Sequence, residues 1–165
     1  MSKHKVKSLS ELKEIVDSLK KHEKKIGFTN GCFDLIHVGH IKYLRDAKKL
    51  ADVLIVAINS DKSIKALKGS KRPLFPQDER AEILSAFEFI DYVVIFDELD
   101  PEKTISTLLP DILVKGGDYK INEIIGRNTV TSHGGKVIII PEVDGKSTSE
   151  IIRRIVNSKQ YRAKI

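Results

Sequence analysis

The strongest constraint on the fold is an uninterrupted apolar run, VLIVAI, at residues 53–58 between Asp52 and Asn59. A strand that is apolar on both faces is typical of the centre of a parallel sheet. Further short strands are expected at about 24–29, 92–96, 111–114 and 136–140. Helical patterns alternate with them, at about 40–50, 78–89, 101–108, 122–131 and 147–158. Strands that alternate with helices form βαβ units, so we predict a single α/β domain with a Rossmann-like, doubly wound parallel sheet.

An N-terminal helix is expected before the first strand. Ser8-Leu9-Ser10-Glu11 has the form of a capping box, and apolar residues follow it at helical spacing, namely Leu12, Ile15, Val16 and Leu19. We therefore divide the chain into an N-terminal helical lead-in at 1–25, a main domain at 26–158 and a basic C-terminal tail at 159–165.

Composition excludes several classes of protein. The chain has 165 residues, of which 41% are hydrophobic and 32% charged, as in a globular protein with a sizeable core. A single cysteine excludes a disulfide framework and fits a reducing compartment. The first residues lack the apolar segment of a secretion signal, and no apolar run reaches the roughly 18 residues of a membrane span. We expect a cytoplasmic protein with no membrane partner.

The net charge of +6 is the one feature that suggests nucleic acid as a partner. The excess lies at the ends of the chain, because residues 1–25 and 157–165 carry most of the unbalanced lysines and arginines. Aromatic residues make up 6% of the chain, and no basic and aromatic stripe suggests a stacking platform. We therefore predict no nucleic-acid partner.

Candidate chemistry follows the first predicted strand, in the segment TNGCFDLIHVGH at residues 29–40. Gly31 and Gly39 would let backbone approach a ligand, and the helix that begins there offers unpaired N–H groups that favour a phosphate. His37 and His40 flank this point and can donate hydrogen bonds to a polyphosphate. The alternative is a purely structural turn. Zinc would need three or four ligands, which the sequence does not obviously supply, so no metal ligand is predicted.

This segment resembles the HxGH signature of the nucleotidyltransferase superfamily, within its cytidylyltransferase-like group. Further motifs follow in the expected order, at 59–61 (NSD), 67–73 (LKGSKRP), 114–119 (VKGGDY) and 145–148 (GKST). The ordered set resembles the adenylyltransferase domain of the ADP-heptose synthase family, over residues 8 to 156. Many members carry this domain fused to a sugar kinase. The length of the chain leaves no room for a kinase, so we expect the stand-alone form.

The resemblance implies transfer of AMP from ATP to D-glycero-β-D-manno-heptose 1-phosphate, with release of pyrophosphate and with Mg²⁺ arriving on the nucleotide. It assigns catalytic roles to His37, His40 and Lys68. It assigns nucleotide binding to Thr29, Asn30, Gly31, Cys32, Phe33, His37, Gly39, His40, Arg72, Gly116, Gly117, Asp118, Ser147 and Thr148. Members often associate as dimers, so a homodimer is an assembly that the resemblance allows.

Several positions allow two interpretations of their role. Residues 62–72 are expected to form a mobile basic loop over the phosphate site, in which Lys65 is an alternative to Lys68 as the residue that binds phosphate. Asp34 is expected to stabilise the turn, and Cys32 to line the nucleotide without acting as a nucleophile. Arg80 either orients the site or contacts substrate. Asp118 either binds ribose or stabilises a turn, and Ser147 and Thr148 are helix caps that can also bind phosphate.

Other functions remain open. Residues 141–145 lack the arginine often found there in cytidylyltransferases, which favours ATP over CTP. Glycerol-3-phosphate cytidylyltransferase and an FAD synthase-type enzyme are alternatives within the same fold. A non-catalytic nucleotide-binding or nucleic-acid-binding module is the alternative from another class.

Overall fold

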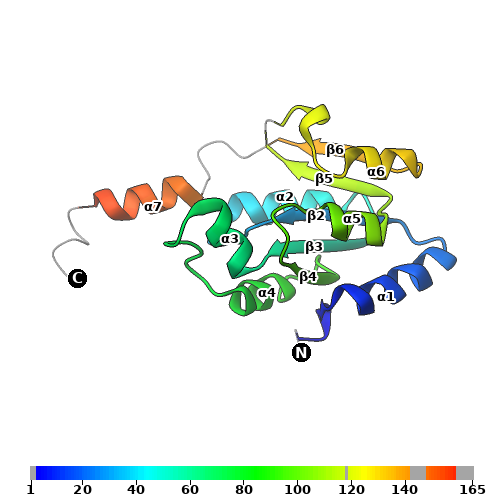
Figure 1. The fold of residues 1–165 in the computed structure, drawn as a ribbon, viewed down its shortest axis with the longest axis horizontal. Helices are drawn as coiled ribbons and strands as arrows, with labels where there is room; N and C mark the ends of the chain where they lie inside the picture. The colour runs from blue at the N-terminus through cyan, green and yellow to red at the C-terminus, as the bar shows by residue number, and fades with distance from the viewer. Residues whose placement is uncertain (1–2, 118, 142–147, 159–165) are drawn as a thin grey trace.

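The computed structural model describes residues 3–117, 119–141 and 148–158. Its centre is a six-stranded sheet in the order β1-β4-β3-β2-β5-β6, in which every neighbouring pair is parallel (Figure 1). The strands are β1 (Val6–Lys7), β2 (Ile26–Gly31), β3 (Val53–Asn59), β4 (Tyr92–Phe96), β5 (Ile112–Gly116) and β6 (Lys136–Ile140). The predicted α/β class with a doubly wound parallel sheet is confirmed.

Helices fill most of the connections between strands. They are α1 (Leu9–Lys21), α2 (Val38–Lys48), α3 (Asp61–Lys68), α4 (Gln77–Ser85), α5 (Glu102–Leu108), α6 (Arg127–Ser132) and α7 (Thr148–Asn157), with short 3₁₀ turns η1 (Lys3–Lys5) and η2 (Ile121–Glu123). In Figure 1, α7 extends away from the sheet. None of the described helices has the length and hydropathy required to cross a lipid bilayer.

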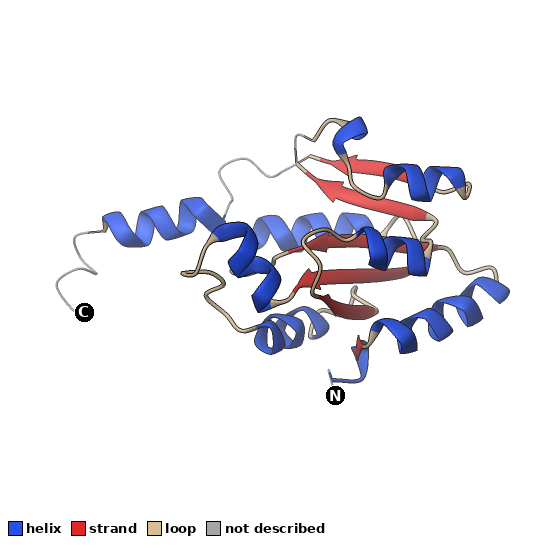
Figure 2. Ribbon diagram, in the orientation of Figure 1, coloured by secondary structure: helices blue, strands red, loops and turns tan. Residues whose placement is uncertain are grey.

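The helices bury both faces of the sheet (Figure 2). β3 shows this directly, because Val53, Ile55 and Ala57 belong to one core cluster while the alternate residues belong to the other. The first cluster includes residues of α1, α5 and α6, and the second includes residues of α2 and α4. The fully apolar run at the centre of the sequence is therefore buried on both sides.

The N-terminal segment is part of this packing. The capping box forms, since Ser8 accepts a hydrogen bond from the Glu11 N–H and the Glu11 side chain accepts one from the Ser8 N–H. Leu12 and Val16 of α1 are completely buried in the first core cluster. β1, which the sequence did not predict, pairs with β4 and extends the same sheet.

The segment expected as a basic loop is largely helical. Ser60 caps α3 by accepting a hydrogen bond from the Ser63 N–H, and Ile64 is fully buried on the inner side of that helix. The helix continues to Lys68 and stops at Gly69, whose φ of 92° is left-handed. The prediction of a loop is therefore wrong for 62–68, where a buried apolar residue and a serine cap favour a helix.

The starts of the inner strands are joined by a repeated arrangement of aspartates. Asp52, Asp91 and Asp111 each come directly before a strand, and each makes two reciprocal hydrogen bonds with one residue of the neighbouring strand or its approach. Their N–H groups donate to the carbonyls of Lys25, Leu54 and Ile26, respectively, and their carboxylates accept from the N–H groups of the same three residues. This edge of the sheet is thus held by paired backbone and carboxylate bonds.

Candidate active site

The site lies at the opposite, carboxyl-terminal edge, where the strand order reverses around β2. In open parallel sheets this is the position at which ligands bind. β2 ends at Gly31, and α2 begins at Val38 after His37, whose backbone is extended. The His37 side chain makes no capping hydrogen bond to this helix. The N–H groups in the first turn of a helix lack partners within the helix, and they form a site that favours an anion.

The two histidines of the motif stack against each other. Their ring centroids are 3.8 Å apart with an interplanar angle of 27°, and the Phe33 ring lies 5.2 Å from that of His40. Phe33 adopts a left-handed φ of 45°, which is uncommon for an aromatic residue. A Cβ on Gly31 would lie 2.9 Å from the Phe33 ring, so a larger residue at position 31 would force this ring to move. The turn brings both imidazoles to the start of α2.

His40 is held as a neutral imidazole. Burial, followed by the positive charges of His37 and Lys68, lowers its pKa to about 4. Its Nδ1 atom is buried and has no hydrogen-bond partner within the described part of the chain. A buried polar atom without a partner is costly, so such an atom in a cavity is expected to serve a ligand.

A cavity of about 500 Å³ opens in front of the histidines. This volume is in the range of small-molecule sites. Ten of the predicted site residues line it, namely Asn30, Gly31, Cys32, Phe33, His37, Gly39, His40, Lys68, Gly116 and Thr148. The structure therefore brings together residues from the β2–α2 turn, α3, the end of β5 and the start of α7.

Three predicted residues do not line this cavity. Thr29 is fully buried, and its hydroxyl lies 2.5 Å from that of Tyr43. Arg72 pairs with Asp34, and Gly117 is buried with its N–H donating to the carbonyl of Ile140. Asp118 and Ser147, also predicted for the nucleotide, lie outside the described residues.

Asp34 ties the β2–α2 turn to the loop before α4. It accepts hydrogen bonds from the N–H groups of Leu74 and Phe75, and forms a 2.6 Å ion pair with Arg72. Burial acts to raise the pKa of Asp34, but the bonds from Phe75, Arg72 and Leu74 outweigh it and hold the pKa below its ordinary value. Asp34 therefore has the structural role that the sequence suggested.

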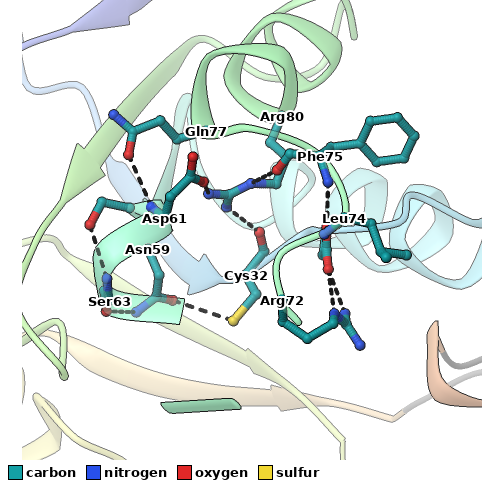
Figure 3. Close-up of polar contacts among 11 residues, drawn as sticks. Cys32, Asn59, Asp61, Ser63, Arg72, Leu74, Phe75, Gln77 and Arg80 are labelled. Atoms are coloured by element: carbon teal, nitrogen blue, oxygen red, sulfur yellow. Dashed lines mark hydrogen bonds and ion pairs between the residues drawn. The ribbon is translucent and has the colours of Figure 1, made fainter. Parts of the chain in front are cut away.

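Arg80 forms a second link between the same segments (Figure 3). This side chain is completely buried, and it donates to the carbonyls of Cys32 and Phe75 and to Asp61 at the start of α3. Of the two readings of Arg80, the geometry matches the orienting one, because the guanidinium holds the backbone beside the histidines.

Cys32 and Asn59 connect the turn to β3. The thiol lies 3.7 Å from Asn59 Oδ1, and the Asn59 amide donates to Ser63 Oγ (Figure 3). The Ser63 hydroxyl in turn donates to the Glu98 carbonyl. The loop after β4 is thereby joined to the end of β3. Asn59 lines the cavity but was not assigned to it from the sequence.

Tyr43 was also missed. Its hydroxyl donates to the Val114 carbonyl, and burial raises its pKa above the ordinary value for tyrosine. A Cβ on Gly116 would lie 3.0 Å from the Tyr43 ring, which explains a small residue there. The helical pattern at 40–50 includes Tyr43, but no signal in the sequence placed this residue at the cavity.

Lys115 is the most informative residue that the sequence did not single out. It lies at the end of β5, lines the cavity and donates a 2.8 Å hydrogen bond to Asn30 Oδ1. Burial lowers its pKa to about 8, an effect that the nearby Cys32 partly offsets. A charged residue in the otherwise apolar strand ILVKG is the signal that could have identified it.

The described residues include no group of three or more His, Cys, Asp or Glu side chains that could hold a metal ion. Asp100 and Glu123 line the cavity as separate carboxylates from different loops. Two imidazoles, two lysines and a helix N-terminus give the cavity the chemical character of an anion site.

Comparison with known proteins gives consistent results. A family model described as cytidylyltransferase-like matches residues 28–154. The bifunctional protein HldE of Citrifermentans bemidjiense is 54% identical over 157 residues, which cover 95% of this chain and 32% of that protein. HldE of Geobacter sulfurreducens is 52% identical over 154 residues, covering 93% of this chain and 31% of that protein. The chain thus spans about a third of the length of these curated relatives.

Two solved structures are similar in fold. The lipopolysaccharide core biosynthesis protein of Thermoplasma volcanium is 30% identical with a TM-score of 0.61, covering 74% of this chain and 99% of that one. Pantoate-beta-alanine ligase of Francisella tularensis, solved with beta-gamma ATP and beta-alanine, is 16% identical with a TM-score of 0.62. That match covers 94% of this chain and 80% of the ligase, and at this identity the likeness concerns the fold alone.

Proposed function

Since the chain belongs to the cytidylyltransferase-like family, we propose that it is a nucleotidyltransferase that transfers AMP from ATP to a sugar 1-phosphate. The observation that carries the proposal is the stacked pair His37 and His40 at the start of α2, where both line a cavity of about 500 Å³. The acceptor we propose is D-glycero-β-D-manno-heptose 1-phosphate, on the basis of the ordered motifs described above. The products are ADP-heptose and pyrophosphate.

The proposed reaction is an in-line displacement at the α-phosphorus of ATP. A phosphate oxygen of the acceptor forms the new bond to this phosphorus, and the bond to the bridging oxygen between the α and β phosphates breaks. Pyrophosphate leaves with the electron pair of that bond. Such a reaction relies on positioning and on stabilisation of charge, and it needs no covalent enzyme intermediate.

In this proposal the cavity residues stabilise the leaving pyrophosphate. Neutral His40 and its stacked neighbour His37 donate hydrogen bonds to the β and γ phosphates, together with the N–H groups of the first turn of α2. Lys68, close enough to affect the pKa of His40, adds a full positive charge. These groups are oriented before the substrate arrives, which is the arrangement that stabilises developing negative charge most effectively.

Nucleotidyltransferases generally use a divalent metal with the triphosphate, and we propose Mg²⁺ here. The cavity fits this because Mg²⁺ is commonly held by phosphate oxygens and water with one or two carboxylates, and Asp100 and Glu123 line the wall. When bound, the ion would neutralise part of the phosphate charge. We further propose that the enzyme acts in the cytoplasm, binds no nucleic acid and forms a homodimer.

The test is a matrix of nucleotides and acceptors, with pyrophosphate release as the readout. ATP and CTP are each combined with heptose 1-phosphate, glycerol 3-phosphate and FMN. We expect turnover for ATP with heptose 1-phosphate, and a loss of about 100-fold or more in kcat for His37→Ala. Turnover with another pair alone would contradict the substrate assignment. A wild-type protein that binds nucleotide but turns over no pair would indicate the non-catalytic alternative.

A further inference from the structure

The cavity holds two separate cationic groups, on opposite sides of the end of β2. Lys68 belongs to α3, which follows β3, and it lies close to the histidines. Lys115 belongs to β5, on the other side of β2 in the sheet. The two groups therefore act on different parts of the cavity.

Lys115 is a half-buried ammonium whose hydrogen-bond partner is a neutral amide. It donates to the amide oxygen of Asn30 at 2.8 Å, and its Nζ lies 5.8 Å from the centroid of the Tyr119 ring. Within the described ranges, no carboxylate forms an ion pair with it. Taking a charge out of water without a counter-charge is unfavourable, so this lysine is best explained by an anion that binds in the cavity.

The proposed reaction brings two anions into this cavity. The triphosphate has its partners at the start of α2, where the histidines, the helix N–H groups and Lys68 converge. From this placement we propose that Lys115 binds the phosphate of the acceptor, and that Asn30 holds the ammonium in position. This inference rests on the proposed nucleotidyltransferase function and adds a substrate-binding residue to it.

A cation in this position has a clear chemical purpose. The attacking group is a phosphate that carries about two negative charges near neutral pH, so it needs no base to remove a proton. It must instead approach a triphosphate of the same sign of charge. An ammonium beside it lowers this repulsion and fixes its direction of approach.

The main test measures the KM for the acceptor and the KM for ATP separately in variants of Lys115. Lys115→Met removes both the charge and the hydrogen bond to Asn30, while Lys115→Gln can keep the hydrogen bond without the charge. We expect both variants to raise the KM for the acceptor about 10- to 100-fold and to change the KM for ATP by less than about twofold. Lys62→Met, on the exposed side of α3 and outside the cavity, is the matched control and should behave as wild type.

Two outcomes of this experiment would overturn the proposal. Restoration of the acceptor KM by Lys115→Gln would assign Lys115 a structural role through Asn30. A rise in the KM for ATP, with that for the acceptor unchanged, would assign Lys115 to the nucleotide. Thermal unfolding of each variant establishes that the compared proteins are folded.

The pH dependence of kcat/KM distinguishes a charged Lys115 that binds substrate from a Lys115 with a purely structural role. With a pKa of about 8, the free enzyme loses the Lys115 charge as the pH rises, so kcat/KM for the acceptor should fall above about pH 8. Among the residues that the structure describes, the other titratable groups around this part of the cavity are Cys32 after β2, Tyr43 on α2, Tyr119 after β5 and Glu123 on η2. Comparison with Lys115→Gln separates their contributions, because only the Lys115 limb should disappear. Persistence of the limb in this variant would contradict the proposal.

Chemical labelling tests the site without turnover. Wild-type protein is treated with trinitrobenzenesulfonate, and modification of Lys115 is followed by mass spectrometry with Lys62 as the internal control. Heptose 1-phosphate should protect Lys115 about tenfold while ATP alone should not. If the substrate matrix identifies another acceptor, that phosphate takes its place. If no pair turns over, the proposed function fails, and protection by inorganic phosphate still decides whether Lys115 is an anion site.

Discussion

His40 lies in surroundings that disfavour its protonated form, with a pKa lowered to about 4 by burial and by His37 and Lys68. An ordinary imidazole titrates at 6.5. Between these two values the unfolded chain binds a proton at this position that the folded protein does not bind. Protons therefore favour unfolding as the pH falls through this window, and the effect is complete below the folded pKa.

The difference between the folded and unfolded pKa of His40 predicts how the stability of the protein depends on pH. Between pH 7 and pH 5, the free energy of unfolding of the nucleotide-free protein should fall by about 2 kcal/mol more in wild type than in His40→Gln. Urea unfolding at both pH values measures it. His22→Gln, at an exposed position after α1, is the control for removal of a histidine outside the cavity. Equal pH dependence in wild type and His40→Gln would show that His40 is not held neutral.

Residues of the site differ in how far the sequence alone could predict them. His37 and His40 are recognisable because a short motif places both on one turn, so local sequence determines their proximity. The position of Lys115 depends on tertiary structure, since only the folded chain shows that Asn30, and no described carboxylate, lies beside its ammonium. Arg72 is similar, because its partner Asp34 is distant in the sequence.

Among the elements, the β2–α2 turn and the segment that precedes α4 are joined by Arg80. Its guanidinium donates to two carbonyls and to Asp61, so a single side chain fixes the backbone at Cys32 relative to α3 and α4. Removal of this side chain would leave the Cys32 and Phe75 carbonyls without these donors. The turn that carries the histidines would lose one of its two ties to α4.

We expect Arg80→Met to lower the free energy of unfolding by about 3 kcal/mol, since it breaks a buried ion pair and leaves buried acceptors unpaired. Denaturant unfolding measures the loss, and pyrophosphate release should show a lower kcat in protein that remains folded. Arg154→Met, at an exposed position on α7, is the matched control. A variant as stable and active as this control would exclude the proposed role of Arg80 as an anchor.

Helices and strands were predicted accurately where the pattern of apolar residues was long and regular. The five strands found by their apolar runs are present, and the capping box correctly marked the start of α1. β1 was missed because two residues carry no periodicity, and only pairing with β4 makes them a strand. α3 was missed because its exposed lysines dominate the pattern, while its single buried apolar residue, Ile64, gives a weak helical signal.

For the molecule as a whole, the sheet order places one cavity across the two halves of the fold, with β3 on one side of β2 and β5 on the other. Residues that lie far apart in the chain, such as Asn30, Lys68 and Thr148, meet there. A ligand that contacts both halves should stabilise the whole folded domain. Binding is therefore expected to raise the melting temperature as well as to affect the kinetics.

We expect ATP with Mg²⁺, at about one hundred times its dissociation constant, to stabilise the fold by about 2.7 kcal/mol. For a domain of this size this corresponds to a rise in the melting temperature of roughly 5–10 °C. Differential scanning fluorimetry measures it, with CTP expected to give a smaller shift. His37→Ala should lose most of the ATP shift. An unchanged melting temperature in wild type would contradict nucleotide binding at this cavity.

The reciprocal bonds of Asp52, Asp91 and Asp111 have a consequence at the far edge of the sheet. A slip of one residue between two strands would reverse which face each side chain occupies. The hydrogen bonds of these aspartates fix the register of β3, β4 and β5 at the start of each strand. The same register determines where the residues at the other end of each strand lie relative to the ligand. A substitution of Asp52 or Asp111 should therefore misplace Asn59 or Lys115 from roughly 13–23 Å away, although neither aspartate lines the cavity.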